Sequence, residues 1–317
     1  MEEFYYPSKG EGKIHACRWI PEGPIRAVLQ IVHGVAEYVE RYAPFAEFLN
    51  ERGIAVVGED HMGHGKSIGD EGTQGYFAGG WDAAVADTHT LYEMTREEFP
   101  KTPCFLLGHS MGSFMARTFL FRYPNSGIRA AVIMGTGWQN PAVLTAGKAL
   151  TEVLVRTQGE KTVSEKVQSL MFGAYSKYFE GEDPFAWVSK NAASLQRYLD
   201  DPLCGFPLTN GLARDMMDGL RMIQNRSNLD KMIKTLPVLF VSGEDDPVGS
   251  MGEGVKKTYE AFEKAGMLKL KMKLYPGMRH EILNEEGREG VMEDILAWML
   301  EQLYRAEAIQ AGSKYHK

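Results

Sequence analysis

The sequence has few cysteines and no long apolar run. Its 317 residues include three cysteines, Cys17, Cys104 and Cys204, which are far apart and form no C-x-x-C pair, so they indicate neither a disulfide framework nor a zinc knuckle. No apolar stretch reaches the roughly 18 residues that a membrane-spanning helix needs. The acidic N-terminus lacks the apolar segment of a secretory signal peptide. We therefore expect a soluble, cytoplasmic protein.

Clusters of basic residues are also missing. Lys and Arg total 35 against 42 Asp and Glu, a net charge of −7, and no basic run is present, which argues against a nucleic-acid partner. Hydrophobic residues make up 44% and charged residues 24%, values that exclude disordered, collagen-like and coiled-coil proteins. The length suits one large α/β domain with an insertion.

What the chain does contain is an alternation of short β-branched runs and longer amphipathic segments. The predicted strands after residue 20 are Ala27–Val32, Ile54–Gly58, Pro103–Leu107, Ala130–Met134, Val238–Ser242 and Leu268–Tyr275. The helices predicted between or after them are Arg41–Arg52, Trp81–Phe99, Met111–Tyr123, Glu253–Ala265 and Glu289–Leu303. This alternation of largely apolar strands with helices indicates a mostly parallel sheet with helices on both faces. Two earlier strands, 4–6 and 14–19, have no helix between them and predict an antiparallel edge.

The alternation stops between residues 135 and 228. This stretch has helical segments at Pro141–Thr157, Ser164–Lys177 and Asn210–Asn225 but no strand pattern. A loop of about ninety residues does not fit a compact domain, so we interpret the stretch as an inserted helical cap. The predicted organisation is a core of residues 1–134 and 229–317 with a cap of residues 135–228.

Two segments match the pattern G-x-S-x-G, in which small residues allow a sharp turn from a strand into a helix. Ser110 in Gly108–Gly112 follows the strand PCFLLG and begins the helix MGSFMARTFLFRY. Ser67 in Gly65–Gly69 lies several residues beyond its strand, and the chain continues as Asp-Glu-Gly rather than as a helix. A serine at such a turn takes a strained conformation, and the helix N-terminus faces the developing negative charge. We predict Ser110 as a catalytic nucleophile.

A serine nucleophile needs a histidine base and a carboxylate that orients it. In the chain order nucleophile, acid, base, only two of the eight histidines, His280 and His316, lie late enough. His316 is the penultimate residue, whereas His280 lies in the loop before the last predicted helix. We predict His280 as the base.

The predicted acid lies after the strand VLFVSG, in the run Glu244–Pro247. Because a proline forces the residue before it into an extended conformation and removes a backbone donor, we favour Asp246. Asp245 remains the alternative.

An oxyanion hole needs two backbone N–H groups aimed at one oxygen. We expect one from Met111, the residue after the predicted nucleophile. The other is expected from Val35, because Gly34 allows a tight turn after the strand AVLQIV. Glu37 and Arg41 are four residues apart and predict an ion pair that holds this loop.

His61 and His64 have a His-x-x-His spacing with Asp60 beside them, which raises the question of a metal. A catalytic zinc takes three protein ligands and an open position, and no third ligand is evident here. We interpret these residues as a structural turn and expect no metal and no cofactor.

Five segments together resemble the monoacylglycerol lipase and lysophospholipase branch of the α/β-hydrolases, which is grouped with the serine aminopeptidases. They are HGVAEYVERY (33–42), EDHMGHGKS (59–67), GHSMGS (108–113), SGEDDPV (242–248) and PGMRHEILNE (276–285). The resemblance implies an α/β-hydrolase fold, a triad of Ser110, Asp246 and His280, and an oxyanion hole from Val35 and Met111. Tyr38 departs from the family pattern, which has a second histidine there.

The function that we expect is hydrolysis of carboxylic esters, with monoacylglycerols or lysophospholipids as the substrates that the resemblance implies. The partner is then a small-molecule ester or lipid, with transient contact between the cap and a membrane surface. One alternative is a proline-releasing aminopeptidase, although such enzymes show HGGPG where this chain has HGVAE. Another is a non-catalytic binding module, although such proteins tend to lose a triad member.

Overall fold

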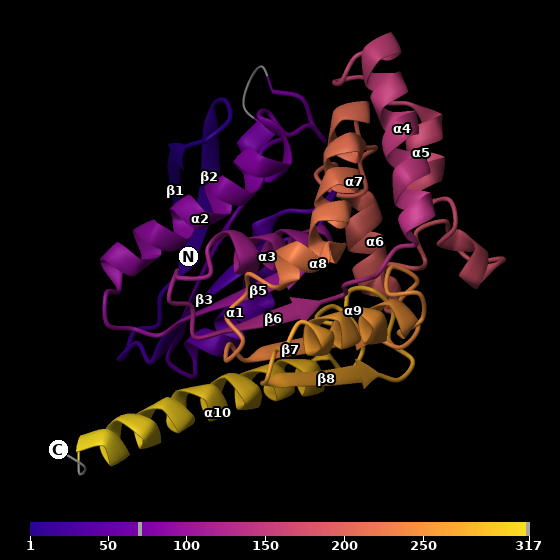
Figure 1. Cartoon of the computed structure of the whole chain (residues 1–317). Coiled ribbons are helices and arrows are strands. Elements are labelled where there is room, and N and C mark those ends of the chain that lie inside the picture. The colour runs from indigo at the N-terminus through magenta and orange to yellow at the C-terminus, as the bar shows by residue number, and fades with distance from the viewer. Residues whose placement is uncertain (69–71, 315–317) are drawn as a thin grey trace.

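A computed structural model describes the backbone of residues 1–68 and 72–314 and the side chains up to residue 304 outside that gap. An eight-stranded sheet in the order β1-β2-β4-β3-β5-β6-β7-β8 forms its centre (Figure 1). The strands are β1 (Glu2–Pro7), β2 (Lys13–Trp19), β3 (Ala27–Val32), β4 (Ile54–Glu59), β5 (Cys104–His109), β6 (Ala130–Met134), β7 (Val238–Gly243) and β8 (Leu270–Tyr275).

The pairing of the strands follows from the connections between them. The turn between β1 and β2 is too short for a crossover, and the two strands pair antiparallel with Tyr6 opposite Ile14. β2 pairs antiparallel with β4, and the pairs from β4 through β3, β5, β6 and β7 to β8 are all parallel. The predicted mostly parallel sheet with an antiparallel edge is confirmed.

Helices cover both faces of the sheet, and the central strands β3, β4, β5, β6 and β7 are buried at every position. In β3, Val28 and Val32 point into one core and Leu29 and Ile31 into the other. The first core is closed by α2 (Gly80–Glu98), α3 (Met111–Arg122) and α9 (Glu253–Lys264), and the second by α1 (Ala43–Asn50) and α10 (Arg288–Lys314). Figure 1 shows α10 along the opposite side of the sheet from α2. The predicted arrangement of an α/β-hydrolase core is confirmed.

Five helices lie between β6 and β7, and we call this part of the chain the helical segment (Figure 1). They are α4 (Pro141–Gln158), α5 (Glu165–Phe172), α6 (Ala192–Asp200), α7 (Asn210–Gln224) and α8 (Arg226–Leu229). The predicted helix Ser164–Lys177 is divided into α5 and the 3₁₀ turn η3 (Ser176–Phe179), and α6 was not predicted. None of the helices in the described residues is long and apolar enough to cross a membrane.

The contact between α7 and α2 depends on a glycine. A Cβ at Gly219 would lie 2.4 Å from Cε2 of Trp81, and the indole is held by its own hydrogen bond to the Thr118 hydroxyl (3.3 Å). The helical segment therefore approaches the core closely at this point, and the ring has little room to move away.

We expect Gly219→Ala to destabilise the protein by about 1 to 3 kcal/mol, since it overpacks this contact. Gly290→Ala on α10 is the matched control, because a Cβ there meets nothing within 4 Å. The control should be neutral or stabilising by up to about 1 kcal/mol, since alanine favours helix. Urea unfolding of both variants checks the prediction, and equal stabilities would contradict it.

Candidate active site

Ser110 occupies the sharp turn between β5 and α3. Its backbone has φ 53° and ψ −123°, a conformation that L-residues rarely adopt. A Cβ at Gly108 would lie 2.2 Å from the carbonyl oxygen of Gly112, and one at Gly112 would lie 2.0 Å from that of Val32. The two glycines of this motif are therefore required by the close approach of β5, α3 and β3.

Ser67, the serine of the second motif, has a different environment. Its hydroxyl donates to the carbonyl oxygen of Asp60 (2.6 Å) and accepts the backbone N–H of His15 (2.8 Å). The side chain is buried, and Gly69 of the motif lies outside the described residues. These bonds make Ser67 a brace between β2 and the turn after β4.

His280 and Asp246 are brought together from the loops after β8 and β7. Nδ1 of His280 lies 2.9 Å from Oδ2 of Asp246, and both side chains are buried. The same carboxylate accepts the Ser242 hydroxyl (3.1 Å) and the backbone N–H of Val248 (2.9 Å). Asp245 is partly exposed, and its backbone N–H donates to the carbonyl of Met278 (3.0 Å). Of the two candidate acids, the structure places Asp246 against His280.

Trp187 of the helical segment also contacts His280, and the sequence analysis did not identify it. The two rings lie 5.3 Å apart, and the carbonyl of Trp187 accepts the backbone N–H of His280 (3.3 Å). The next carbonyl, that of Val188, accepts the N–H of Glu281 (2.8 Å). Trp187 lies in a stretch without helical or strand periodicity, so no local pattern in the sequence distinguishes it.

The loop of residues 33–37 lies beside Ser110. A Cβ at Gly34 would lie 3.1 Å from Cβ of Ser110, and the N–H of Gly34 donates to Oε1 of Glu37 (2.6 Å). Ala36 has φ 53°, so this loop is strained as well. Within the part of the chain that the structure describes, no acceptor bonds the backbone N–H of Val35 or of Met111. The two groups predicted to form the oxyanion hole are thus free of protein partners.

The ion pair predicted between Glu37 and Arg41 is confirmed, with Nη1 of Arg41 2.8 Å from Oε2 of Glu37. Arg41 also binds both carboxylate oxygens of Glu281 at 2.7 Å. Oε1 of Glu37 lies 3.0 Å from Nδ1 of His109. Burial alone would lower the pKa of His109, but the bond to Glu37 and its charge outweigh burial and raise it.

His33, His61 and His64 form a buried cluster of tilted rings around the predicted turn. Nε2 of His33 accepts the N–H of His61 (2.9 Å), and the two rings lie 3.9 Å apart. Burial lowers the pKa of His33 well below its ordinary value and that of His64 to about 3. In the described residues, the group of side chains with metal-ligand spacing includes neither His61 nor His64. Their geometry fits the predicted structural role.

A pocket of about 460 Å³ lies between the sheet and the helical segment, and Ser110 and His280 both line it. This volume is typical of small-molecule sites. The apolar residues of the helical segment that line the pocket include Met171, Phe172, Met216 and Leu220. Leu170 and Met217 do not line the pocket and belong instead to the hydrophobic packing next to it.

Two bonds connect the 33–38 region to the helical segment beside this pocket. The hydroxyl of Tyr38 donates to Oδ2 of Asp201 (2.7 Å), and the N–H of Gly205 donates to the carbonyl of Ala36 (2.9 Å). Tyr38, which stands where the family pattern has histidine, therefore joins the core to this segment.

The sheet order, the serine turn and the position of the acid and histidine after later strands define an α/β-hydrolase. The family model described as serine aminopeptidase, S33, matches residues 23–287, and the chain belongs to this family. The resemblance noted from the sequence is confirmed.

Proteins similar to the chain include lipases and esterases. It is 28% identical over 287 residues to a monoacylglycerol lipase of Mycolicibacterium smegmatis, covering 90% of this chain and 92% of the relative. It is 25% identical over 294 residues to the monoglyceride lipase of Homo sapiens, covering 91% and 88%. The crystal structure of a thermostable carboxyl esterase from Bacillus coagulans is similar with a TM-score of 0.89 and 27% identity, covering 95% of this chain and 98% of that one. The protein is an enzyme of the carboxylic ester hydrolase class.

The contact between Asp246 and His280 leads to a prediction about the two adjacent aspartates. Asp246→Asn should lower esterase turnover by about 10⁴, since an amide cannot hold the histidine in the required tautomer. Asp245→Asn is the matched control and should cost little, because its side chain is partly exposed. Turnover of a p-nitrophenyl ester by both variants is the measurement, and the opposite ranking would assign the role to Asp245.

Proposed function

We propose that the protein hydrolyses monoacylglycerols through a covalent acyl-enzyme formed on Ser110. The Oγ of Ser110 attacks the ester carbonyl while His280 accepts its proton, and Asp246 stabilises the imidazolium that results. The negative charge on the carbonyl oxygen is met by the N–H groups of Val35 and Met111. The tetrahedral intermediate then collapses, His280 protonates the leaving glycerol oxygen, and the acyl group remains on Ser110.

The second half of the reaction repeats these roles with water. His280 removes a proton from a water molecule, the resulting hydroxide attacks the acyl-enzyme, and the same two N–H groups stabilise the oxyanion. Ser110 then leaves with the proton from His280, and the fatty acid is released. The observation that carries this proposal is the shared pocket, which places Ser110, His280 and the 33–37 loop around one cavity.

The lining of the pocket favours a neutral lipid over a charged one. Residues 135–228, which we propose act as a cap, contribute Met171, Phe172 and Leu220 and would enclose an acyl chain. Among the described lining residues there is no Lys or Arg, which a phosphate-bearing lysophospholipid would need for its headgroup. A glycerol headgroup carries no charge and needs no such partner. The lipase relatives support the same substrate class.

An aminopeptidase would need a free carboxylate for the substrate amine. The acidic residues of the lining are Glu37 and Glu281, and Arg41 binds both. Since their charges are already compensated, the pocket favours an ester over an N-terminal amine.

The assignment of the nucleophile is tested by covalent labelling. A fluorophosphonate should label the wild type at one site, and Ser110→Ala should lose both labelling and esterase activity while it stays folded, because only a hydroxyl is removed. The control Ser67→Ala should retain labelling if it folds. Labelling that persists in Ser110→Ala would contradict the mechanism, and an unlabelled wild type would favour a non-catalytic module.

The role of the helical segment is tested by substitution of two adjacent residues of α5, Leu170 and Met171. Both side chains are half-buried, but only Met171 lines the pocket. Met171→Trp should lower kcat/KM for long-chain monoacylglycerols relative to short ones by about tenfold, since displacing about two methylenes costs about 1.6 kcal/mol. Leu170→Trp should leave the chain-length profile unchanged. Identical profiles for both variants would place chain-length selection outside this segment.

A further inference from the structure

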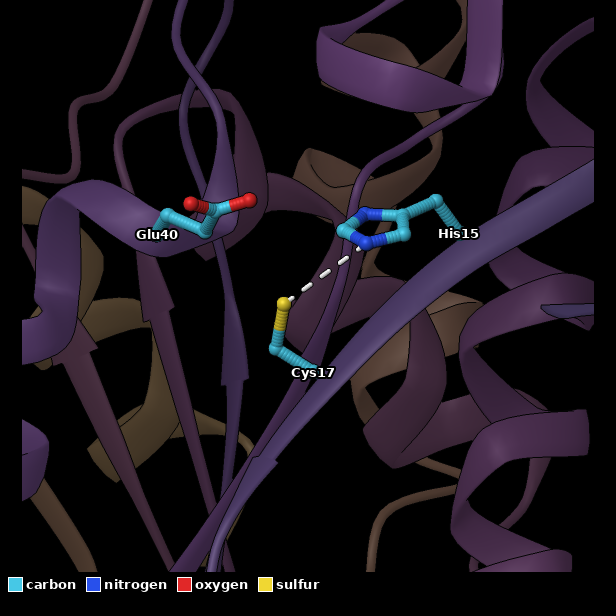
Figure 2. Close-up of side chains that lie close together, drawn as sticks. All are labelled: His15, Cys17 and Glu40. Atoms are coloured by element: carbon cyan, nitrogen blue, oxygen red, sulfur yellow. Dashed lines mark hydrogen bonds between the residues drawn. The ribbon is translucent and has the colours of Figure 1, made fainter. Parts of the chain in front are cut away.

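Three side chains with metal-ligating atoms meet on the sheet edge, outside the pocket (Figure 2). His15 and Cys17 are alternate residues of β2 and so lie on one face of the strand. Glu40 comes from the 3₁₀ turn η1 (Val39–Tyr42), which follows the 33–37 loop. Sγ of Cys17 lies 3.8 Å from Nε2 of His15, and one ligand atom from each of the three residues lies within 4.8 Å of the others. A sulfur, a nitrogen and an oxygen atom that can bind a metal therefore lie close together at this position.

The orientation of the imidazole is set by a carboxylate behind it. Nδ1 of His15 lies 2.8 Å from Oδ2 of Asp60, which also accepts the backbone N–H of Lys66 (2.8 Å). The other oxygen of Asp60 accepts the N–H of Val39 (2.8 Å). Because an ionised carboxylate only accepts, Nδ1 carries a proton, and Nε2 on the other side of the ring lies 3.1 Å from Oε2 of Glu3 and 3.8 Å from Sγ of Cys17. Metal-binding histidines are held in this way by carboxylates.

We propose that His15, Cys17 and Glu40 form a structural Zn²⁺ site. Zinc binds cysteine, histidine and carboxylate ligands in a tetrahedron, and its usual bond lengths imply an S···N edge of about 3.6 Å. The distance from Cys17 to His15 is 3.8 Å, so little movement is needed. The fourth ligand that we propose is Glu3 of β1, whose Oε2 lies 3.1 Å from Nε2 of His15, although Glu3 is not one of the three residues whose ligand atoms all lie within 4.8 Å of one another.

The ammonium group of Lys66 lies between two of the proposed ligands. Nζ of Lys66 lies 2.9 Å from Oε2 of Glu3 and 2.6 Å from Oε1 of Glu40. Its side chain is 41% exposed and can turn toward solvent. Zn²⁺ and the ammonium group therefore compete for the same two carboxylates. Removing Lys66 should therefore raise the affinity of the site for the metal.

Bound metal would join β1, β2 and η1, and because none of the four proposed ligands lines the pocket it would act on stability rather than on ester hydrolysis. Such a site is separate from the proposed ester hydrolysis, and it departs from our expectation that the protein holds no metal. The sequence did not predict this site, because a single H-x-C pair is not a recognised metal-ligand spacing and Glu40 is brought beside the pair only by the fold.

The experiment uses Co²⁺ as a spectroscopic substitute for Zn²⁺ in the full-length protein. Wild type should bind one Co²⁺ with a thiolate-to-cobalt charge-transfer band in the near ultraviolet. Cys17→Ser should lose the band, whereas Cys104→Ser, which changes another buried cysteine, should keep it. Normal esterase activity of Cys17→Ser would establish that it is folded. A wild type without the band, or a band that survives in Cys17→Ser, would overturn the proposal.

A second measurement uses the competition with Lys66. Lys66→Met should bind Zn²⁺ at least about tenfold more tightly than wild type, since a positive charge leaves the site. Lys13→Met, on an exposed residue of the same strand, should bind as wild type does. Zn²⁺ should also raise the Tm of wild type by about 2 to 4 °C and leave Cys17→Ser unchanged. Equal Zn²⁺ affinity in Lys66→Met and wild type would refute the site.

Discussion

The arrangement around the pocket depends on the buried carboxylate of Glu37. Burial by itself would raise the pKa of Glu37, but the bond to His109 and the charges of His109 and Arg41 lower it, so the group is ionised. The same carboxylate accepts the N–H of Gly34 and the hydroxyl of Tyr42. Removing one partner of such a buried pair typically costs about 3 to 5 kcal/mol, because the other charge is left uncompensated. One group thus connects the 33–37 loop, the serine turn and, through Arg41, the loop that carries His280.

The parallel sheet explains why residues so far apart in the chain meet there. The loops after β3, β5, β7 and β8 all leave the same edge of the sheet, since the carboxyl ends of parallel strands lie together. The strained conformations of Ser110 and Ala36 are found in two of these loops. Their cost is offset by the rigid packing of strands that are buried at every position.

The sequence predicted the parts of this structure that local patterns encode. Largely apolar strands such as Ala27–Val32 predict burial on both faces of the sheet. The proline after Asp246 favoured Asp246 over Asp245 as the catalytic acid without any knowledge of its contact with His280. The contact of Trp187 with His280 and the bond from Tyr38 to Asp201 could not be predicted. Each joins positions more than ninety residues apart, and neither residue lies in a periodic pattern. The helix α6 was also missed.

The contacts between the helical segment and the core determine which of its helices are held in place. Arg117 on α3, the helix that begins after Ser110, is fully buried and donates to the carbonyls of Gly137 (3.1 Å) and Ile223 (3.3 Å). Burial lowers its pKa to about 9, so the guanidinium stays charged at neutral pH. The Arg117 side chain thus binds both the start of the helical segment, at Gly137, and the C-terminal end of α7, where the helix dipole is negative. Since Gly219 also packs α7 against Trp81, α7 is fixed to the core. Under the proposed function, adaptation to different acyl chains would therefore fall to α5 and η3, whose residues are largely exposed or half-buried.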